Sequence, residues 1–128
     1  MSPLRFSYVA TLDCNDPQAL APFWAEALHY RANFFHPPYL TLTDPTGRSP
    51  ELVLQHVPEP KQGKNRMHLD LFVDDIEREA ARLIALGARR LSAGTLSGPT
   101  GDTWIVMADP DGNELCVCQG DLSTLEGG

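Results

Sequence analysis

The sequence is poor in several features that define whole classes of protein. Its 128 residues include three cysteines, Cys14, Cys116 and Cys118. An odd number argues against a disulfide framework, and the C-x-C spacing argues against structural zinc sites, which use paired C-x-x-C. Because Cys116 and Cys118 alternate with Val117, both lie on one side of a strand. Reduced, half-buried thiols are the simplest interpretation.

Long apolar runs and basic residues are also scarce. No run approaches the ~18 apolar residues of a membrane span, and residues 1–10 contain no secretory signal. A cytoplasmic protein without a membrane partner is therefore expected. Only 10 Lys and Arg oppose 17 Asp and Glu, which gives a net charge of −7. Such a field repels phosphate backbones, so nucleic acid is not an expected partner.

Sequence motifs for several enzyme classes are missing as well. The chain contains no G-x-S-x-G, P-loop or G-x-G-x-x-G pattern, so hydrolase, nucleotidase and Rossmann interpretations lack support. Cys116 has no adjacent basic residue that would lower its pKa, which weakens a role as a nucleophile.

The elements that the sequence does indicate belong to an α+β chain. Asp16 followed by Pro17 is a typical helix start, because the carboxylate caps free amides and proline fits the first helical position. Asp74 and Glu77 match a capping box for a second helix. Helices are expected over residues 15–30 and 74–88, and strands over residues 6–14, 39–44, 51–57, 68–73, 89–93, 103–109 and 113–119. Residues 94–101 are expected to form a flexible loop.

The two halves of the chain repeat one order of elements. "LDCNDPQALAPFWAEALHYRA" parallels "LFVDDIEREAARLIALGARR", and the turn "DPTG" parallels "DPDG". A period of about 60 residues that occurs twice indicates a duplicated βαβββ module. Two such modules would place curved sheets around a shared concave surface, a preferred kind of ligand site. One domain, residues 1–128, is expected, with module one at about 5–57, a linker at 58–66, module two at about 67–120 and a frayed tail at 121–128.

Three segments carry a family likeness: "TLDCNDPQALAPFWAEALHY", "PEPKQGKNRMHLDLFVDD" and "ADPDGNELCV". The chain resembles the vicinal oxygen chelate superfamily, which includes glyoxalase I, bleomycin-resistance proteins and extradiol dioxygenases, and within it the glyoxalase-like domain subgroup. The resemblance implies paired βαβββ modules that form an open, barrel-like curved sheet. It also implies a homodimer.

In the metal-dependent enzymes of this superfamily, each module supplies two ligands. One is a His or Gln seven residues before the helix-starting Asp, where this chain has His68 in module two and Val9 in module one. The other is a Glu on the last strand, where module two has Cys116, with Glu114 two residues earlier on the same face; the match of "ELVLQ" puts Gln55 there in module one. Catalytic sites usually need three good protein ligands, so no metal or other cofactor is favoured. If a divalent metal does bind, the implied ligands are His68, Glu114, Cys116 and Gln55.

His68 and Asp70 lie on one face of the same expected strand. In one interpretation this face lines the cavity, His68 contacts a ligand and Asp70 orients or charges it. In the other, His68 is a buried, hydrogen-bonded histidine and Asp70 caps a loop or faces a dimer interface. Phe35, Tyr39 and Trp104 are candidate aromatic walls, and Trp104 follows the glycine-rich "SGPTGD" loop, a candidate lid.

Three functions stay open, because this superfamily hosts many chemistries. The leading hypothesis is a cytoplasmic, homodimeric protein that binds a small aromatic or amphipathic organic molecule without a metal, for sequestration, resistance or an unassigned reaction. The second is a metal-dependent lyase, isomerase or dioxygenase, and the third is a regulatory or interaction module without a ligand. His68 is the best catalytic candidate. The expected ligand-binding residues are His68, Gln55, Phe35, Tyr39, Trp104, Asp70 and Cys116.

Overall fold

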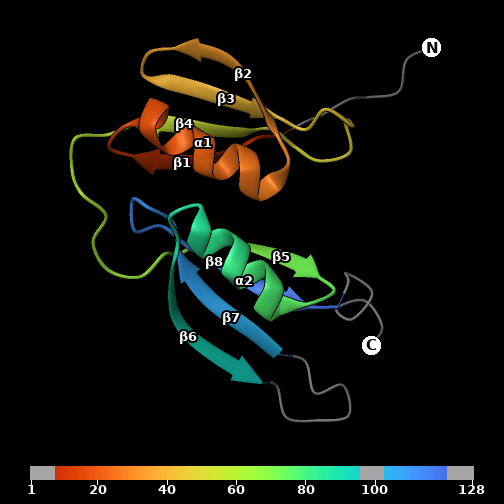
Figure 1. Ribbon diagram of the computed structural model, residues 1–128. Coiled ribbons are helices and arrows are strands. Elements are labelled where there is room, and N and C mark those ends of the chain that lie inside the picture. Colours follow the sequence, from red (N-terminus) through yellow and green to blue (C-terminus); the bar gives the residue numbers. More distant parts are fainter. Residues whose placement is uncertain (1–7, 96–102, 121–128) are drawn as a thin grey trace. The chain divides into compact units, whose positions relative to one another are not determined.

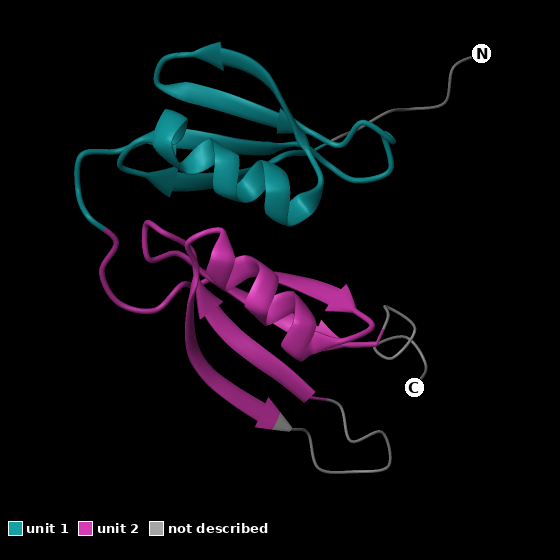
Figure 2. Cartoon of the chain, in the orientation of Figure 1, with its two compact units in different colours: residues 1–60 teal, residues 61–128 magenta. Residues whose placement is uncertain are grey.

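The structure is a computed structural model that describes residues 8–95 and 103–120. The chain divides into two compact units, residues 1–60 and 61–128 (Figures 1 and 2). The boundary falls inside the linker expected at residues 58–66. The expected tail and most of the expected loop at residues 94–101 lie outside the described residues.

Both units have the expected βαβββ order. Unit 1 consists of β1 (Ala10–Cys14), α1 (Pro17–Leu28), β2 (Arg31–His36), β3 (Tyr39–Thr43) and β4 (Leu52–His56). Unit 2 consists of β5 (Leu69–Val73), α2 (Ile76–Ala85), β6 (Arg89–Thr95), β7 (Thr103–Ala108) and β8 (Glu114–Gln119). The sheet orders are β1-β4-β3-β2 and β5-β8-β7-β6, with only the first pair of each parallel. These two mixed sheets confirm the α+β class, and the strands described do not close into a barrel.

Aspartate caps start both helices. The Asp16 carboxylate accepts a hydrogen bond from the backbone amide of Ala19 at 3.2 Å. The Asp75 carboxylate accepts one from the backbone amide of Arg78 at 3.1 Å. The capping box expected from Asp74 was wrong, because the cap is the next residue and α2 starts at Ile76. The φ angle of Gly87 is 118°, which favours glycine just after the helix.

Each helix packs across one face of its own sheet (Figure 1). Alternation along the strands then gives every sheet one apolar face towards the helix and one face turned away from it. The buried side chains of unit 1 include Leu20, Phe23, Trp24, Ala27, Leu40, Leu42, Leu52 and Leu54. Those of unit 2 include Ala80, Leu83, Ile105, Met107, Leu115 and Val117. The other face of the second sheet, here termed the helix-free face of unit 2, carries Asp70, Phe72, Trp104, Val106, Glu114, Cys116 and Cys118.

The duplication extends to the strand register. A bulge interrupts the pairing of β2 with β3 between Ala32 and Phe34, and the pairing of β6 with β7 between Arg90 and Ser92. β2 is an edge strand whose six residues are all exposed, so it lacks the buried alternation by which a strand is usually recognised in sequence. This explains why no strand was expected at residues 31–36.

The remaining differences concern strand ends. β1 begins at Ala10, although a strand was expected from residue 6, and β6 continues to Thr95, into the expected loop. In the described part of the chain, no helix has the length and apolar character that crossing a membrane requires.

Candidate functional site

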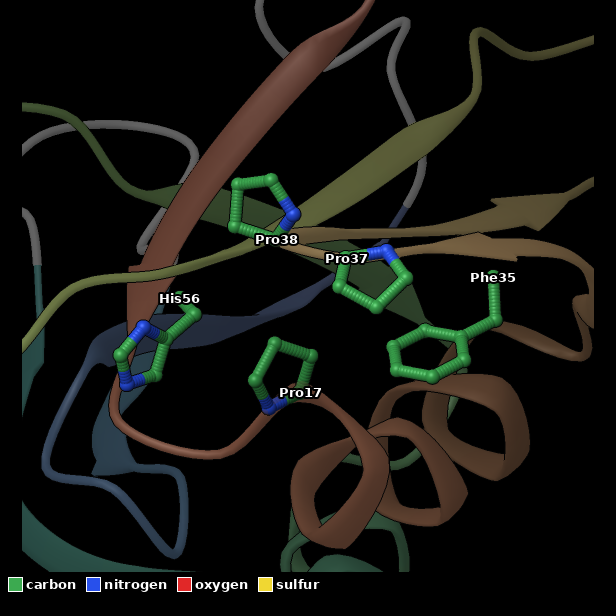
Figure 3. A pocket seen from close by; sticks show the side chains of 5 residues that line it. All are labelled: Pro17, Phe35, Pro37, Pro38 and His56. Atoms are coloured by element: carbon green, nitrogen blue, oxygen red, sulfur yellow. The ribbon is translucent and has the colours of Figure 1, made fainter.

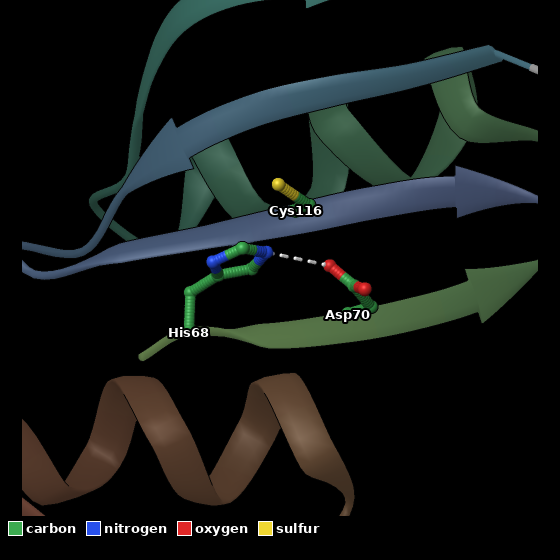
Figure 4. A group of neighbouring side chains, drawn as sticks. All are labelled: His68, Asp70 and Cys116. Carbon is green, nitrogen blue, oxygen red and sulfur yellow. Dashed lines mark ion pairs between the residues drawn. The ribbon is translucent and has the colours of Figure 1, made fainter. Parts of the chain in front are cut away.

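Three predicted site residues converge on the helix-free face of unit 2 (Figure 4). His68 Nε2 lies 3.0 Å from Asp70 Oδ1. The ligand atoms of His68, Asp70 and Cys116 all lie within 4.8 Å of one another. The His68 and Asp70 side chains are 40% and 41% exposed, whereas Cys116 is buried. The cluster therefore has a buried sulfur at its base and two polar groups open to solvent.

Strand geometry explains why these three residues meet. His68 and Asp70 are two residues apart at the start of β5, so their side chains lie on the same side. Asp70 is the direct ladder partner of Cys116 on β8. This register brings together residues 46 positions apart in the sequence (116 − 70 = 46). The interpretation of His68 as a buried histidine does not fit its exposure.

The Cys116 thiol of the cluster and the neighbouring Cys118 thiol are both held in the protonated form. Burial raises the pKa of Cys116, and the Asp70 carboxylate adds to this effect. Burial, followed by the charge of Asp70, raises the pKa of Cys118 to about 11. Neither of these two cysteines is therefore a thiolate nucleophile at neutral pH.

The structure does not bring Glu114 into this cluster. Its two carboxylate oxygens lie 3.2 Å from Lys61 Nζ and 2.7 Å from Lys64 Nζ. The hydrogen bond from Lys64 is the main cause of the lowered pKa of Glu114. Asn65 also donates a hydrogen bond to the Glu114 carbonyl at 3.3 Å. The segment before β5 therefore neutralises this carboxylate.

Trp104 provides an aromatic surface on the same face as the cluster. It is the ladder partner of Cys118 on one side and of Gly94 on the other. A Cβ atom added at Gly94 would overlap the benzene ring of this indole. The ring therefore occupies the space that a side chain at residue 94 would need, and Gly94 allows this position.

The other predicted ligand residues belong to unit 1. Tyr39 is 43% exposed and pairs with Gln55, so both lie on the sheet face turned away from α1. Phe35 pairs with Leu40 and therefore lies on the opposite face from Tyr39. It lines an apolar hollow with a cavity volume of about 460 Å³ (Figure 3). The lining residues are Pro17, Phe35, Pro37, Pro38 and His56.

The register also changes the position assigned to Gln55. Asp70 pairs with Cys116 in unit 2, and the corresponding pair in unit 1 is Thr11 with Val53. Val53, and not Gln55, therefore occupies the position equivalent to Cys116. Gln55 corresponds to Cys118.

The donors of the cluster fit a divalent ion in kind. Imidazole, carboxylate and thiolate are the three ligand types that zinc and related ions use. Among the described residues, this is the one group of three or more such side chains whose ligand atoms converge. Asp70 takes part in it, although the resemblance did not imply a ligand at this position.

Sequence reasoning missed three residues of this region. Lys61 and Lys64 stood in the expected polar linker, and no local signal connected them with Glu114. Gly94 stood in the expected loop, where a glycine is unremarkable. Each owes its role to a partner distant in the sequence.

Several solved structures are similar to this chain in fold. A glyoxalase/bleomycin resistance protein/dioxygenase family enzyme from Burkholderia phytofirmans has a TM-score of 0.71 and 13% identity, over 87% of this chain and 95% of that one. A glyoxalase-related enzyme from Fulvimarina pelagi has a TM-score of 0.68 and 22% identity, over 91% and 89%. A fosfomycin resistance protein from Listeria monocytogenes, solved with Mn(II) and sulfate, has a TM-score of 0.75 and 13% identity, over 94% of each chain.

At these identities the likeness demonstrates the fold alone. A comparison with curated proteins gives no significant match. The family profile described as glyoxalase-like domain, however, matches residues 9–118, which is most of the chain. The chain therefore belongs to the glyoxalase-like domain family, as the resemblance of its three segments predicted.

Proposed function

We propose that the protein binds a small aromatic or amphipathic organic molecule on the helix-free face of unit 2. One observation carries the proposal: this face presents a flat indole and an exposed carboxylate–imidazole pair on the same side of one sheet. Trp104 stands two strands away from Asp70 and is shifted by two residues along the strands, a separation of roughly 12 Å at ordinary strand spacing and rise. A small organic molecule can span that distance.

The side chains indicate what kind of ligand fits. An aromatic ring of the ligand would stack on Trp104. The Asp70 carboxylate accepts hydrogen bonds and attracts positive charge, and the net charge of −7 acts in the same direction. Cys116, as a neutral thiol, gives the site a polarizable floor. We therefore expect neutral or cationic aromatic molecules to bind better than anions.

In the leading form of this proposal, the side chains hold the ligand without a metal. Two observations support this form: Val9, at one of the four ligand positions of the superfamily, has no donor atom, and both oxygens of Glu114 are paired with lysines. His68 is then the best-placed group to move a proton, through Nε2 beside Asp70. The role would be sequestration, resistance or a metal-free reaction.

The second candidate function is a metal-dependent lyase, isomerase or dioxygenase. The convergence of His68, Asp70 and Cys116 specifically favours it. A divalent ion at this cluster would polarise an oxygen atom of the ligand as a Lewis acid. The similar fosfomycin resistance protein was solved with Mn(II).

A cytoplasmic homodimer is part of the proposal. Sedimentation of the purified chain over a wide concentration range tests the assembly. A concentration-independent monomer would contradict it.

The experiment for the organic ligand uses the chelator-treated full chain and a library of small aromatic compounds, neutral, cationic and anionic. A ligand at 100 times its Kd stabilises a protein by about 2.7 kcal/mol, which corresponds to a rise in Tm of roughly 10 °C. Ligand binding should also change the fluorescence of Trp104. The other tryptophan, Trp24, is buried in unit 1 and provides an internal reference.

Matched variants locate the binding. Trp104→Ala and Asp70→Asn should reduce the ligand-induced rise in Tm, and Trp104→Phe should abolish the fluorescence change but retain much of the stabilisation. Phe35→Ala tests the hollow of unit 1 as the competing location. If no compound stabilises the metal-free protein, or if Trp104→Ala and Asp70→Asn leave its binding unchanged, the proposal is wrong.

A further inference from the structure

The apolar hollow of unit 1 is built on the side of the sheet that α1 covers. Phe35 pairs with the buried Leu40, and paired residues point to the same side of a sheet. His56 lies next to Gln55 in β4, whose side chain is turned away from α1, so His56 is on the α1 side as well. Pro17 is the first residue of α1 itself. The hollow is therefore separate from the other side of this sheet, and all its walls belong to unit 1.

The walls of the hollow are held in place by the fold itself. Three of the five lining residues are prolines, whose rings have no rotamer freedom to lose when a ligand binds. The His56 amide donates a hydrogen bond to the Pro38 carbonyl at 2.8 Å, which ties β4 to the turn between β2 and β3. The Val57 amide donates one to the Cys14 carbonyl at 2.8 Å, which ties the same strand end to β1. A preformed hollow of this kind binds a ligand at a small entropic cost.

The size and lining of the hollow fit a small organic molecule. Its volume of about 460 Å³ lies within the range of roughly 300–1,000 Å³ that is typical of ligand pockets. Figure 3 shows the Phe35 ring and the His56 imidazole on opposite sides of the prolines. His56 is the one polar side chain among the five, and within the described residues its ring has no hydrogen-bond partner. Apolar walls with a single orienting polar group are the usual composition of a ligand site.

We infer that this hollow is a second ligand site, for a neutral aromatic molecule that carries one hydrogen-bonding group such as a phenolic hydroxyl. The ring of the ligand contacts Phe35 and the prolines, and its hydroxyl pairs with the imidazole of His56. No lining residue carries a permanent charge, so a charged ligand would lose hydration without gaining an ion pair. The inference goes beyond the proposed function and does not depend on it.

A small molecule fits the hollow better than a protein partner does. A stable protein interface takes about 800 Å² and roughly 20–30 residues from each side, whereas five residues line the hollow. Phe34, the exposed ring next to Phe35 in the chain, pairs with Thr41 and lies on the other side of the sheet. It therefore does not extend the apolar surface around the hollow.

NMR titration of the isotope-labelled full chain with 2-naphthol tests the inference. We expect saturable shifts of the backbone amides of Gln18, His36 and His56, which belong to the walls or adjoin them. We also expect NOEs from the naphthol ring protons to the side chains of Phe35 and Pro37. A Kd in the low-millimolar range or tighter is expected for a ligand of this size. 2-Naphthoate, which has the same rings and a charged carboxylate, should bind at least about tenfold more weakly.

Matched variants identify the contributing walls. Phe35→Ala should weaken 2-naphthol binding about tenfold, because it removes the ring contact. Phe34→Ala is the control, since it removes the same ring from the adjacent residue on the opposite side, and it should leave the Kd unchanged. His56→Leu keeps an apolar wall without the hydrogen bond and should weaken binding about fivefold, whereas His56→Gln should restore part of the loss. The melting curve of each variant separates loss of a wall from loss of folding.

Three results would overturn the inference. The first is the absence of saturable shifts at the hollow, and the second is equal weakening by Phe35→Ala and Phe34→Ala. The third, in a mixture of labelled and unlabelled chains without ligand, is NOEs between Phe35 and an aromatic ring of another chain, because a second copy would then fill the hollow. Shifts at Phe35 and His56 report on this site, and the fluorescence of Trp104 reports on the helix-free face of unit 2. Failure of one proposal is therefore distinguishable from failure of the other.

Discussion

Unit 1 and unit 2 share a backbone plan and differ in the chemistry of equivalent positions. Their helix caps, ladder order and edge bulges correspond. The three residues of the His68–Asp70–Cys116 cluster in unit 2 have counterparts that offer no imidazole, carboxylate or thiol. These counterparts are Val9, Thr11 and Val53. A duplicated fold can therefore keep its packing in both copies and retain reactive side chains in one.

Aromatic side chains, by contrast with the reactive ones, are present in both units. Trp104 in unit 2 corresponds to Tyr39 in unit 1, because they pair with Cys118 and Gln55 respectively. Opposite them stand Gly94 and His36. His36 stacks with Phe34 at a ring separation of 6.0 Å, so unit 1 has an aromatic edge where unit 2 has a flat indole over glycine.

The strongest test of this comparison is to introduce the side chains of His68, Asp70 and Cys116 at the equivalent positions of unit 1. The combined Val9→His, Thr11→Asp and Val53→Cys variant should bind one more Co²⁺ per chain than the parent if register alone builds a metal-binding cluster. All three positions are exposed or half-buried, so the fold should tolerate the changes. Equal uptake by the parent and by a folded variant would show that register alone does not build such a cluster.

Equivalent core positions should differ in how much stability they contribute. Trp24 and Leu83 each stand eight residues after a helix-capping aspartate, and both are almost fully buried. Trp24→Ala should cost about 3–5 kcal/mol and Leu83→Ala about 2–5 kcal/mol. We expect the tryptophan variant to lose more, because its ring also packs edge-to-face on Phe23 at 5.3 Å. Urea unfolding measures both, and a larger loss for Leu83→Ala would contradict this ranking.

Much of the fold could be predicted from the sequence, because the sequence signals for it are local. A capping aspartate, a helix-starting proline and an Asp-Pro-x-Gly turn each act on neighbouring residues, so both helices and the duplication were predicted correctly. β2 was missed because an edge strand without buried alternation carries no such signal. Its existence depends on pairing with β3.

The site was predicted in part, for a different physical reason. Alternation along one strand placed His68 and Asp70 together, and the structure confirms that they are neighbours. The membership of Cys116 in the same group, the lysines around Glu114 and the equivalence of Val53 depend on register between strands distant in the sequence. A single sequence does not contain that register.

The turn aspartates offer a smaller contrast between the units. Asp109 is 1% exposed and accepts hydrogen bonds from the amides of Asp111 and Asn113 at 2.8 and 2.9 Å. Asp109→Ala leaves buried donors without this acceptor, so we expect a cost of about 1–3 kcal/mol. Asp44 holds the equivalent turn at the surface, where water can replace it. Asp44→Ala should therefore cost less, and equal losses in thermal unfolding would refute the contrast.

The helix caps should differ by still less. Removal of a capping aspartate costs about 1 kcal/mol. Since Pro17 already favours the first turn of α1, Asp16→Ala should cost less than Asp75→Ala. Asp74→Ala is the control, because this residue precedes the cap, and it should change stability by less than about 0.5 kcal/mol. A loss in Asp74→Ala equal to that in Asp75→Ala would contradict this assignment.

The smallest expected difference between the units concerns how stability depends on pH. The Thr46 hydroxyl and amide lower the pKa of Asp44 in unit 1, and Arg90 lowers the pKa of Glu77 in unit 2. A folded-state pKa below the unfolded one stabilises the protein above the unfolded value, and this contribution is lost as the pH falls through the folded value. The cost of Asp44→Asn or Glu77→Gln should therefore be complete at neutral pH and fade below about pH 4.

Salt should separate the two units in the same experiment. Neutral hydroxyl and amide groups hold Asp44, whereas Glu77 pairs with the charged Arg90 at 2.8 Å on an exposed surface. Added salt screens exposed charges over about 10 Å at 0.1 M. The neutral-pH cost of Glu77→Gln should therefore shrink as salt is raised, while that of Asp44→Asn persists. Urea unfolding at two salt concentrations measures this, and equal sensitivity of both variants would show that charge, and not local hydrogen bonding, also governs the unit 1 turn.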